Sequence, residues 1–198
     1  MRVLYLGLDP ERYPTKVIHY PVIRTERVFS SQAEEAISLW SEFTHAIFTS
    51  RTSVFYWKQD LRRKTVIAIG SATAELLHCP LVSQTPTQEG IIDLLKTIDL
   101  QDAFVFLPHS RRSRPHLREF LEKQNVRHIA LELYDTRVQK PDIPISLETV
   151  DEIVFTSPST VEGFLKIFGK IPEDRKLTCI GPVTEAALFS YRKFEWEL

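Results

Sequence analysis

The chain carries an internal repeat, and no other feature of its sequence restricts the possible folds as strongly. A Phe-Thr-Ser motif occurs at 48–50 and again at 155–157, each time after a short apolar run. An Ile-Gly pair follows in both copies, at 69–70 and at 180–181. From the serine to the glycine the separation is 20 positions in the first copy and 24 in the second. Two motifs in the same order at similar spacing predict two homologous lobes, each a small α/β sandwich.

Short β-type runs alternate along the chain with segments of helical spacing. Several of these runs contain four or five consecutive apolar residues, as is typical of strands covered by helices on both faces. Strands that alternate with helices predict a parallel α/β architecture. The expected strands cover residues 3–8, 44–50, 65–70, 103–108, 127–135, 151–157 and 177–181.

End signals place several of the intervening helices. The apolar positions 117–121 have helical spacing, Pro115 fits a first turn, and Asn125 is expected to end this helix. A second apolar stripe at 161–168 is followed by Gly169 as a stop signal.

A third apolar stripe covers residues 91–98. The preceding Thr85-Pro86-Thr87-Gln88 has the spacing of a capping box. We therefore expect this helix to begin with Pro86 in its first position.

Two extended segments with prolines, 19–24 and 134–141, predict that the chain crosses twice between the lobes. We expect residues 1–28 and 137–198 to form a discontinuous lobe 1. We expect residues 29–136 to form lobe 2. A cleft between two such lobes would be the default ligand site.

The composition favours a soluble globular protein and excludes several other classes. The 198 residues have a formal net charge of −1, so no overall field steers the chain to nucleic acid. No apolar run approaches the roughly 20 residues that span a bilayer, and the N-terminus lacks the features of a secretion signal. The two cysteines, Cys79 and Cys179, form no CxxC pair, which argues against disulfides and structural zinc. We expect a cytoplasmic monomer without nucleic-acid or membrane partners.

Hydroxyl side chains follow the predicted strands at four strand-to-helix turns. Free N–H groups and partial positive charge at helix N-termini suit anions, so these turns are candidates for an anion-binding cleft. Ser50 and Ser157 also suit an ordinary helix N-cap, worth about 1 kcal/mol each. The hydroxyl residues at the four turns are Thr49, Ser50, Ser71, Thr73, Thr156, Ser157 and Thr184.

Four arginines, at positions 111, 112, 114 and 118, follow the predicted strand 103–108. Guanidinium groups match carboxylates and phosphates bidentately, which favours a ligand clamp. The alternative is a solvated loop and helix start, where cations slightly oppose the helix dipole. No aromatic residues are interleaved with the arginines, so RNA binding is less favoured.

The sequence offers little other acid–base or metal chemistry. His109 and His116 lack zinc-ligand spacing and partners, and no dinucleotide or P-loop motif occurs. We therefore expect no cofactor and no metal. Tyr134 lies at a predicted lobe crossing, where a neutral phenol could donate a hydrogen bond into the cleft. Packing of this tyrosine at a strand end is the alternative.

In these motifs the chain resembles the uroporphyrinogen III synthase family. Each motif alone is weak, but their joint order and spacing are specific. The matching segments span about residues 44–188 and are Phe48-Thr49-Ser50, Ile69-Gly70-Ser71-Ala72-Thr73-Ala74, Pro86-Thr87-Gln88-Glu89-Gly90, Leu133-Tyr134-Asp135-Thr136, Phe155-Thr156-Ser157-Pro158-Ser159 and Ile180-Gly181-Pro182-Val183-Thr184.

The resemblance implies an α/β fold of two similar lobes, each a parallel sheet flanked by helices, joined by a two-stranded linker with a cleft between them. It implies cofactor-free cyclisation of hydroxymethylbilane to uroporphyrinogen III, with loss of water and inversion of ring D. In the family the tyrosine that matches Tyr134 assists departure of the ring-A hydroxyl, and cleft groups hold acetate and propionate side chains. The expected substrate-binding residues are Thr49, Ser50, Ser71, Thr73, Thr87, Arg111, Arg112, Ser157, Ser159 and Thr184.

Lobe 1 departs from the family pattern. Only residues 9–15, with two prolines, stand where the family has a full helix, and the chain stops at Leu198 where the family continues. We therefore expect lobe 1 to be shortened. Glu185 replaces a small residue and would repel an acidic substrate if it faced the cleft. The alternatives to the enzyme are a non-catalytic anion or tetrapyrrole binder and a nucleic-acid or regulatory protein that uses the arginines.

Overall fold

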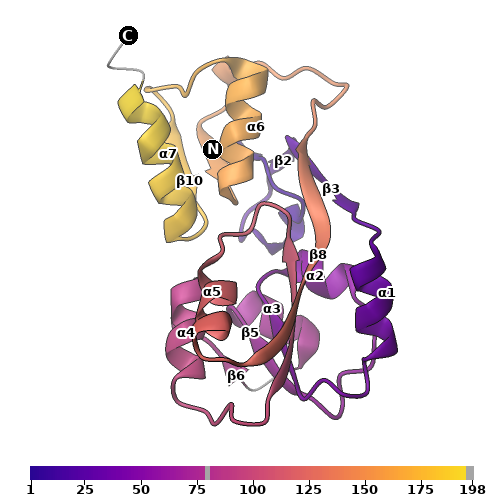
Figure 1. The fold of residues 1–198 in the computed structure, drawn as a ribbon. Helices are drawn as coiled ribbons and strands as arrows, with labels where there is room; N and C mark the ends of the chain where they lie inside the picture. The colour runs from indigo at the N-terminus through magenta and orange to yellow at the C-terminus, as the bar shows by residue number, and fades with distance from the viewer. Residues whose placement is uncertain (79–80, 195–198) are drawn as a thin grey trace. The chain divides into compact units, whose positions relative to one another are not determined.

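The computed structural model describes residues 1–78 and 81–194, with side chains up to Tyr191, and the chain forms two compact units (Figure 1). Unit 1 comprises Met1–Arg24 and Thr136–Leu198, and unit 2 comprises Thr25–Asp135. Cys79, considered above, lies outside the described residues. Every helix of the described part is too short or too polar to cross a membrane.

Unit 2 is built on a six-stranded sheet with the order β3-β8-β7-β4-β5-β6. The four neighbouring pairs from β8 to β6 are parallel. This arrangement confirms the parallel architecture that the alternation of strands and helices predicts. The strands are β3 (Ile23–Arg27), β4 (His45–Phe48), β5 (Thr65–Ala68), β6 (Leu81–Val82), β7 (Phe104–Ser110) and β8 (Arg127–Val138).

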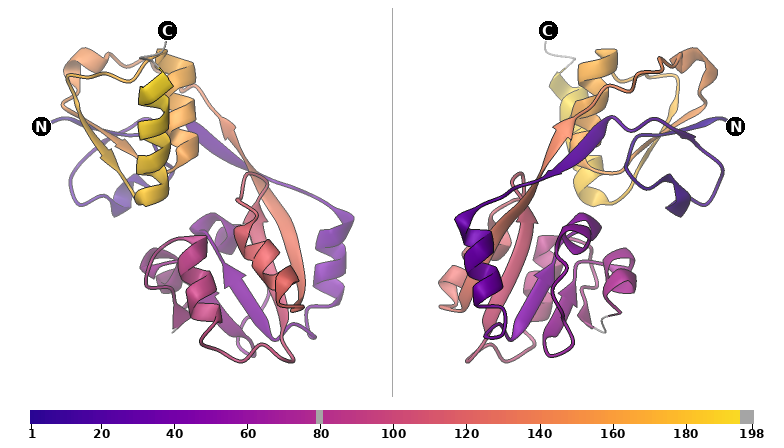
Figure 2. Two further views of the ribbon diagram at one scale, coloured as in Figure 1. Left: turned by 60° about the vertical axis from the view of Figure 1, so that its left-hand side comes forward. Right: turned by 90° about the vertical axis from the view of Figure 1, so that its right-hand side faces the viewer.

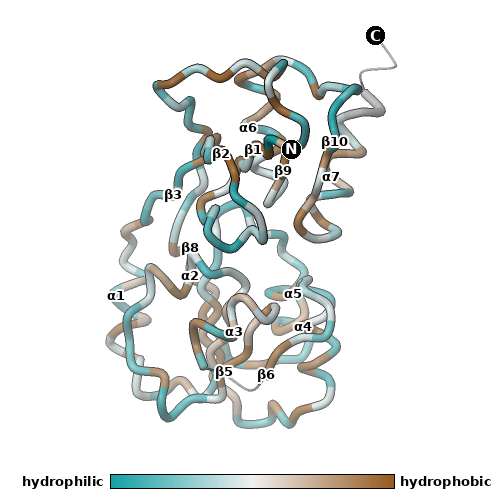
Figure 3. The backbone as a smooth tube through the Cα atoms, turned by 180° about the vertical axis from the view of Figure 1, so that it is seen from behind, coloured by the Kyte–Doolittle hydropathy of each residue, from teal (hydrophilic) through white to brown (hydrophobic). Residues whose placement is uncertain are grey.

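Helices cover both faces of this sheet, because the side chains of its strands alternate between two apolar clusters. Phe104 and Phe106 pack in one cluster with residues of α1 and the end of α2, whereas Val105 and Leu107 pack in the other with residues of α4 and α5. Hydrophobic and hydrophilic residues alternate along the helices, as expected for helices with one buried face (Figure 3). The helices of unit 2 are α1 (Ser31–Ser38), α2 (Arg51–Tyr56), α3 (Ser71–Leu77), α4 (Gln88–Leu95) and α5 (His116–Lys123).

Unit 1 has a four-stranded parallel sheet with the order β10-β9-β1-β2. Its main core lies on the face covered by α6 and α7, where Phe155 packs with Phe164 and Leu188. The opposite face holds a small cluster closed by Tyr13 and Val17. The elements are β1 (Val3–Tyr5), the 3₁₀ helix η1 (Pro10–Arg12), β2 (Ile18–His19), the 3₁₀ helix η2 (Leu147–Thr149), β9 (Glu152–Phe155), α6 (Pro158–Phe168), β10 (Lys176–Cys179) and α7 (Pro182–Phe194).

The two copies of the sequence repeat have equivalent local structures. The first copy is β4-α2 followed by β5-α3, and the second is β9-α6 followed by β10-α7. Phe48 pairs with Ala68 in the first copy and Phe155 with Cys179 in the second. Each of these residues lies two positions before the shared serine or glycine of its motif, so the two copies have one strand register.

The strands β3 and β8 lie side by side and contain the positions where the chain passes between the units (Figure 2). The Val28 N–H donates to the Leu133 carbonyl at 3.0 Å, and the Gln139 N–H donates to the Val22 carbonyl at 2.8 Å. The residue numbers increase in one strand as they decrease in the other, so these two strands are antiparallel. The unit boundaries lie after Arg24 and after Asp135.

Most of the expected helix signals are confirmed. Asn125, just beyond α5, has a φ of 53°, and Gly169 ends α6 with a φ of 85°. The expected start of α4 is wrong, because Thr87, not Thr85, is the N-cap and Pro86 lies outside the helix. The Thr87 side chain accepts the Gly90 N–H at 3.1 Å, which satisfies a helix-terminal donor from that position. The seven expected strands are all present; β1, β4, β5, β9 and β10 are shorter than expected, and β7 and β8 are longer.

Candidate functional site

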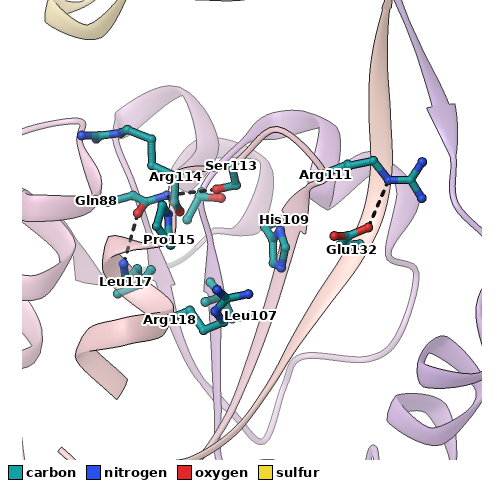
Figure 4. Close-up of a pocket in the computed structure, with 11 residues that line it drawn as sticks. Gln88, Leu107, His109, Arg111, Ser113, Arg114, Pro115, Leu117, Arg118 and Glu132 are labelled. Atoms are coloured by element: carbon teal, nitrogen blue, oxygen red, sulfur yellow. Dashed lines mark hydrogen bonds and ion pairs between the residues drawn. The ribbon is translucent and has the colours of Figure 1, made fainter. Parts of the chain in front are cut away.

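A small polar pocket of about 80 Å³ opens in unit 2 where the chain leaves the carboxyl ends of β4 and β7 (Figure 4). The carboxyl ends of parallel strands meet at one edge of a sheet, and this edge is the usual ligand position in open α/β sheets. The pocket brings Thr49 and Arg111, two of the expected site residues, to one place. Its lining residues are Thr49, Gln88, Leu107, His109, Arg111, Ser113, Arg114, Pro115, Leu117, Arg118 and Glu132.

Gln88 holds one wall of this pocket. Its side chain is buried, and its amide nitrogen donates to the Ser113 hydroxyl and to the Arg114 carbonyl, both at 2.9 Å. Its amide oxygen accepts the Leu117 N–H at 3.1 Å. Three bonds from one side chain fix the start of α5 against the start of α4. This role is not visible in the sequence, because the partners lie 25 to 29 positions away from Gln88.

Arg114, which also lines the pocket, is held by a carboxylate. Its two terminal nitrogens bind both oxygens of Glu89 at 2.6 and 2.9 Å, and Nδ1 of His116 lies 2.9 Å from the same carboxylate. The hydrogen bond from Arg114 is the main reason that the pKa of Glu89 falls to about 2. This bidentate pair holds the Arg114 side chain in a fixed position in the lining of the pocket.

The two arginines expected to bind substrate also have carboxylate partners in unit 2. Arg111 binds Glu132 through Nε at 3.1 Å, and one of its terminal nitrogens lies 3.8 Å from Asp135. Arg112 lies 3.8 Å from the same aspartate, whose side chain is only 7% exposed. These pairs orient the guanidinium of Arg111, whose five N–H donors suit carboxylates.

Tyr134 is buried beside this edge, in β8. The residue is 7% exposed, its ring stacks on that of Tyr56 with 5.9 Å between centroids, and its hydroxyl lies 2.9 Å from the Ser50 hydroxyl. Burial raises the pKa of Tyr134, and hydrogen bonds with the hydroxyls of Ser50, Thr52 and Ser53 oppose this rise. The phenol is therefore neutral near pH 7, as expected.

Ser50 has two roles in this position. Its hydroxyl accepts the Ser53 N–H at 3.0 Å as the N-cap of α2, and it also contacts the phenol of Tyr134. The Ser53 hydroxyl, 2.9 Å from that of Ser50, is fully buried and donates to the Pro108 carbonyl at 3.2 Å. Ser53 was not among the expected site residues, although it follows the Phe-Thr-Ser motif at cap-box spacing.

The other expected residues of unit 2 have different surroundings. Ser71 is exposed at the start of α3, whose N-cap is Gly70. Thr73 is buried at 4% exposure. Thr87 caps α4 as described above.

Three expected residues belong to unit 1. Ser157 is the N-cap of α6, and its hydroxyl oxygen is buried without a hydrogen-bond partner among the described residues. Ser159 is half-buried in the first turn of the same helix. Thr184 is buried and donates to the Ile180 carbonyl at 3.1 Å, whereas Glu185 is exposed.

The described residues contain no group of three or more His, Cys, Asp or Glu side chains arranged to hold a metal ion. In Figure 4, His109 lies between the Arg111–Glu132 pair and Ser113. Among the groups that this edge of unit 2 presents are guanidinium groups, hydroxyls and one phenol. Such groups bind and orient carboxylates and donate single hydrogen bonds.

Two solved structures share the fold. A mutant uroporphyrinogen III synthase from the extremely thermophilic bacterium Thermus thermophilus has a TM-score of 0.63 and 19% identity, over 96% of this chain and 89% of that one. The uroporphyrinogen-III synthetase from Helicobacter pylori has a TM-score of 0.62 and 18% identity, over 97% of this chain and 90% of that one. At this level of sequence identity, the similarity shows that the fold is shared.

The sequence comparisons point to the same family. A curated relative from Methanothermobacter thermautotrophicus, provisionally named a uroporphyrinogen-III synthase, is 27% identical over 191 residues, or 83% of this chain and 76% of the relative. Residues 11–192 match the family model of the uroporphyrinogen-III synthase HemD. This match covers nearly the whole chain, and the chain therefore belongs to the uroporphyrinogen-III synthase family.

Proposed function

We propose that this chain is a uroporphyrinogen III synthase, a cyclising lyase that converts hydroxymethylbilane into uroporphyrinogen III with loss of water and inversion of ring D. The observation that carries this proposal is the family match over residues 11–192. The polar edge of unit 2 supports it, because the substrate is a polycarboxylate and this edge presents arginines and hydroxyls.

The unit 2 pocket is proposed to take one carboxylate-bearing side chain of the substrate. Its volume of about 80 Å³ suits an acetate or propionate group better than a pyrrole ring. Arg118 and Arg111 supply positive charge, and Thr49 supplies a hydroxyl donor. Hydrogen bonds to charged groups contribute about 1.5–3 kcal/mol each, so a few such contacts orient a substrate arm.

Tyr134 is proposed to assist departure of the ring-A hydroxyl. An electron-rich pyrrole expels this hydroxyl readily, and the phenol has only to direct a proton to the leaving oxygen. The larger task is orientation, because free closure gives the unrearranged isomer. Holding two rings in place can supply several kcal/mol without a strong acid or base, which agrees with the absence of a catalytic triad motif in the sequence.

Both units are proposed to contribute to substrate binding, with β3 and β8 acting as the two-stranded linker expected from the sequence. The pairing of these strands across the unit boundaries supports the linker. From unit 1, Ser157 and Ser159 at the start of α6 are the candidates. Thr184 is a weaker candidate, because its hydroxyl is already bound to the Ile180 carbonyl.

Product analysis tests the proposal. The purified protein is incubated with freshly generated hydroxymethylbilane, the products are oxidised, and the isomers are separated by chromatography. Type III product at a rate above the enzyme-free reaction supports the synthase. Type I product alone, together with thermal stabilisation of the protein by the substrate, would instead support a non-catalytic tetrapyrrole binder.

A further inference from the structure

Three hydroxyl groups and one carbonyl form a continuous chain of contacts inside unit 2. The Tyr134 oxygen lies 2.9 Å from that of Ser50, which lies 2.9 Å from that of Ser53. The Ser53 hydroxyl then donates to the Pro108 carbonyl at 3.2 Å. All four residues are buried or partly buried, so bulk water does not compete freely for these protons.

Either oxygen can be the donor in the two contacts of Ser50, and counting protons gives one arrangement in which all three contacts are hydrogen bonds. A carbonyl oxygen only accepts, so the single Ser53 proton goes to Pro108. In this arrangement the contact between the two serines uses the Ser50 proton. The contact between Ser50 and the phenol in turn uses the proton of Tyr134. With this arrangement the phenol is a donor to Ser50 in the resting protein, and its proton points into the protein.

We propose that Ser50 and Ser53 are positioning residues that form a hydroxyl relay for Tyr134. The relay holds the phenol proton until substrate is bound, and the Ser50 hydroxyl then turns to donate to the phenol oxygen. This inference rests on the proposed function in one respect, namely that the ring-A hydroxyl of the substrate receives the phenol proton. The contacts among the three hydroxyls stand on the geometry of unit 2 alone.

The proposed step balances as follows. The bond between the ring-A methylene carbon and its hydroxyl oxygen breaks, and the pyrrole nitrogen supplies the electron pair that stabilises the carbon. The proton of Tyr134 goes to the leaving oxygen and forms water. The phenolate that remains accepts the Ser50 proton as a hydrogen bond, as well as any bond from Thr52. The proton lost from the substrate carbon when the ring closes returns to the phenolate.

The simpler interpretation is that Ser50 is only an N-cap, and the chain contains a matched control for this role. Ser30 caps α1 in the same way, accepting the Ala33 N–H at 3.2 Å. Ser30 lies outside the pocket and the hydroxyl chain. If Ser50 were only an N-cap, Ser50→Ala would therefore lower the melting temperature and leave kcat unchanged, as is expected of Ser30→Ala.

The test compares Ser50→Ala with Ser50→Thr, Ser53→Ala and Ser30→Ala. The first readout is kinetic: Ser50→Ala is expected to lower kcat about tenfold with KM within about twofold, since a bond made to the developing phenolate acts in the transition state. Ser50→Thr keeps the hydroxyl and is expected to restore most of kcat. Ser30→Ala is expected to lower only the melting temperature.

The second readout needs no turnover. The tyrosine doublet in the ultraviolet resonance Raman spectrum reports whether a phenol donates or accepts, and subtraction of the Tyr134→Phe spectrum isolates Tyr134. A donor signature in the wild type that is lost in Ser50→Ala and weakened in Ser53→Ala supports the relay, even if the protein makes no type III product. An unchanged signature, or equal kinetic effects of Ser50→Ala and Ser30→Ala, overturns it. If Ser50→Ala does not fold, Ser53→Ala carries the same spectroscopic test.

Discussion

Ser53 and Thr160 occupy the same position in the two copies of the repeat, three residues after the N-cap, and both side chains are fully buried. Their hydroxyls nevertheless bind different groups. The Ser53 hydroxyl donates to Pro108 in the neighbouring strand β7. The Thr160 hydroxyl donates to the Ser157 carbonyl at 2.7 Å, within its own helix turn. In the first copy, Ser53 thus contacts Ser50, which contacts Tyr134. In the second copy, the hydroxyl of Thr160 binds groups of its own helix turn.

The Thr160 hydroxyl also accepts the backbone N–H groups of Thr156 at 3.0 Å and Ser157 at 3.2 Å. Thr160→Val keeps the shape of the side chain but leaves both donors unpaired. We expect a loss of about 1–3 kcal/mol of unfolding free energy, the range for an unsatisfied buried group. Urea unfolding of the variant and the wild type measures this loss of free energy. Thr97→Val is the control, because that hydroxyl is exposed, and equal effects of the two variants would contradict the structural role of Thr160.

The strands and several helix ends could be predicted from the sequence, because their causes are local. Apolar runs specify buried strands, and the positive φ values of Asn125 and Gly169 fall at residue types that tolerate them. The start of α4 was misjudged because Thr85 and Thr87 both have cap chemistry. Local spacing does not show which of the two meets a helix N–H.

The polar contacts of the site were less predictable, because their partners come from distant elements. Glu132 and Asp135 lie in β8 and meet Arg111 only once β7 and β8 pair. The sequence presents Arg111 as a free cation, whereas the structure shows it already paired. In the same way, the burial of Thr73 and Thr184 depends on how their helices pack and not on their motifs.

Tyr134→Phe removes the phenol oxygen and preserves the ring that stacks on Tyr56. We expect turnover to fall by about tenfold to a hundredfold, toward the range ascribed to a positioned acid. The melting temperature is expected to change little, since the packing is retained. Steady-state assays of type III product measure the first quantity and thermal unfolding the second. Wild-type turnover in this variant would remove Tyr134 from the mechanism.

Arg118→Gln tests the pocket of unit 2. Arg118 lines this pocket and is paired only loosely with Glu122, at 3.5 Å one helical turn away. We expect KM for hydroxymethylbilane to rise about tenfold with little change in kcat, because a charge-assisted bond to a substrate carboxylate is lost in ground and transition states alike. Arg62→Gln, which breaks the pair with Asp60 elsewhere in unit 2, is the control. Equal KM values for the two variants would show that this pocket holds no substrate carboxylate.

The pair of Glu89 and Arg114 makes stability depend on pH in a defined window. The pKa of Glu89 is lowered from 4.5 to about 2 in the folded protein, chiefly by the hydrogen bond from Arg114. The unfolded chain therefore takes up a proton first as pH falls, and the stabilisation present above pH 4.5 is lost on the way to about pH 2. The pair is about half exposed, so solvent screening keeps this contribution small. Glu89→Gln is expected to flatten the fall of unfolding free energy in this window, as measured by urea unfolding at a series of pH values. Glu122→Gln is the control, because the contact of Glu122 with Arg118 is looser, at 3.5 Å. If both variants keep the wild-type slope, the Glu89 carboxylate does not hold Arg114 in solution as it does in the structure.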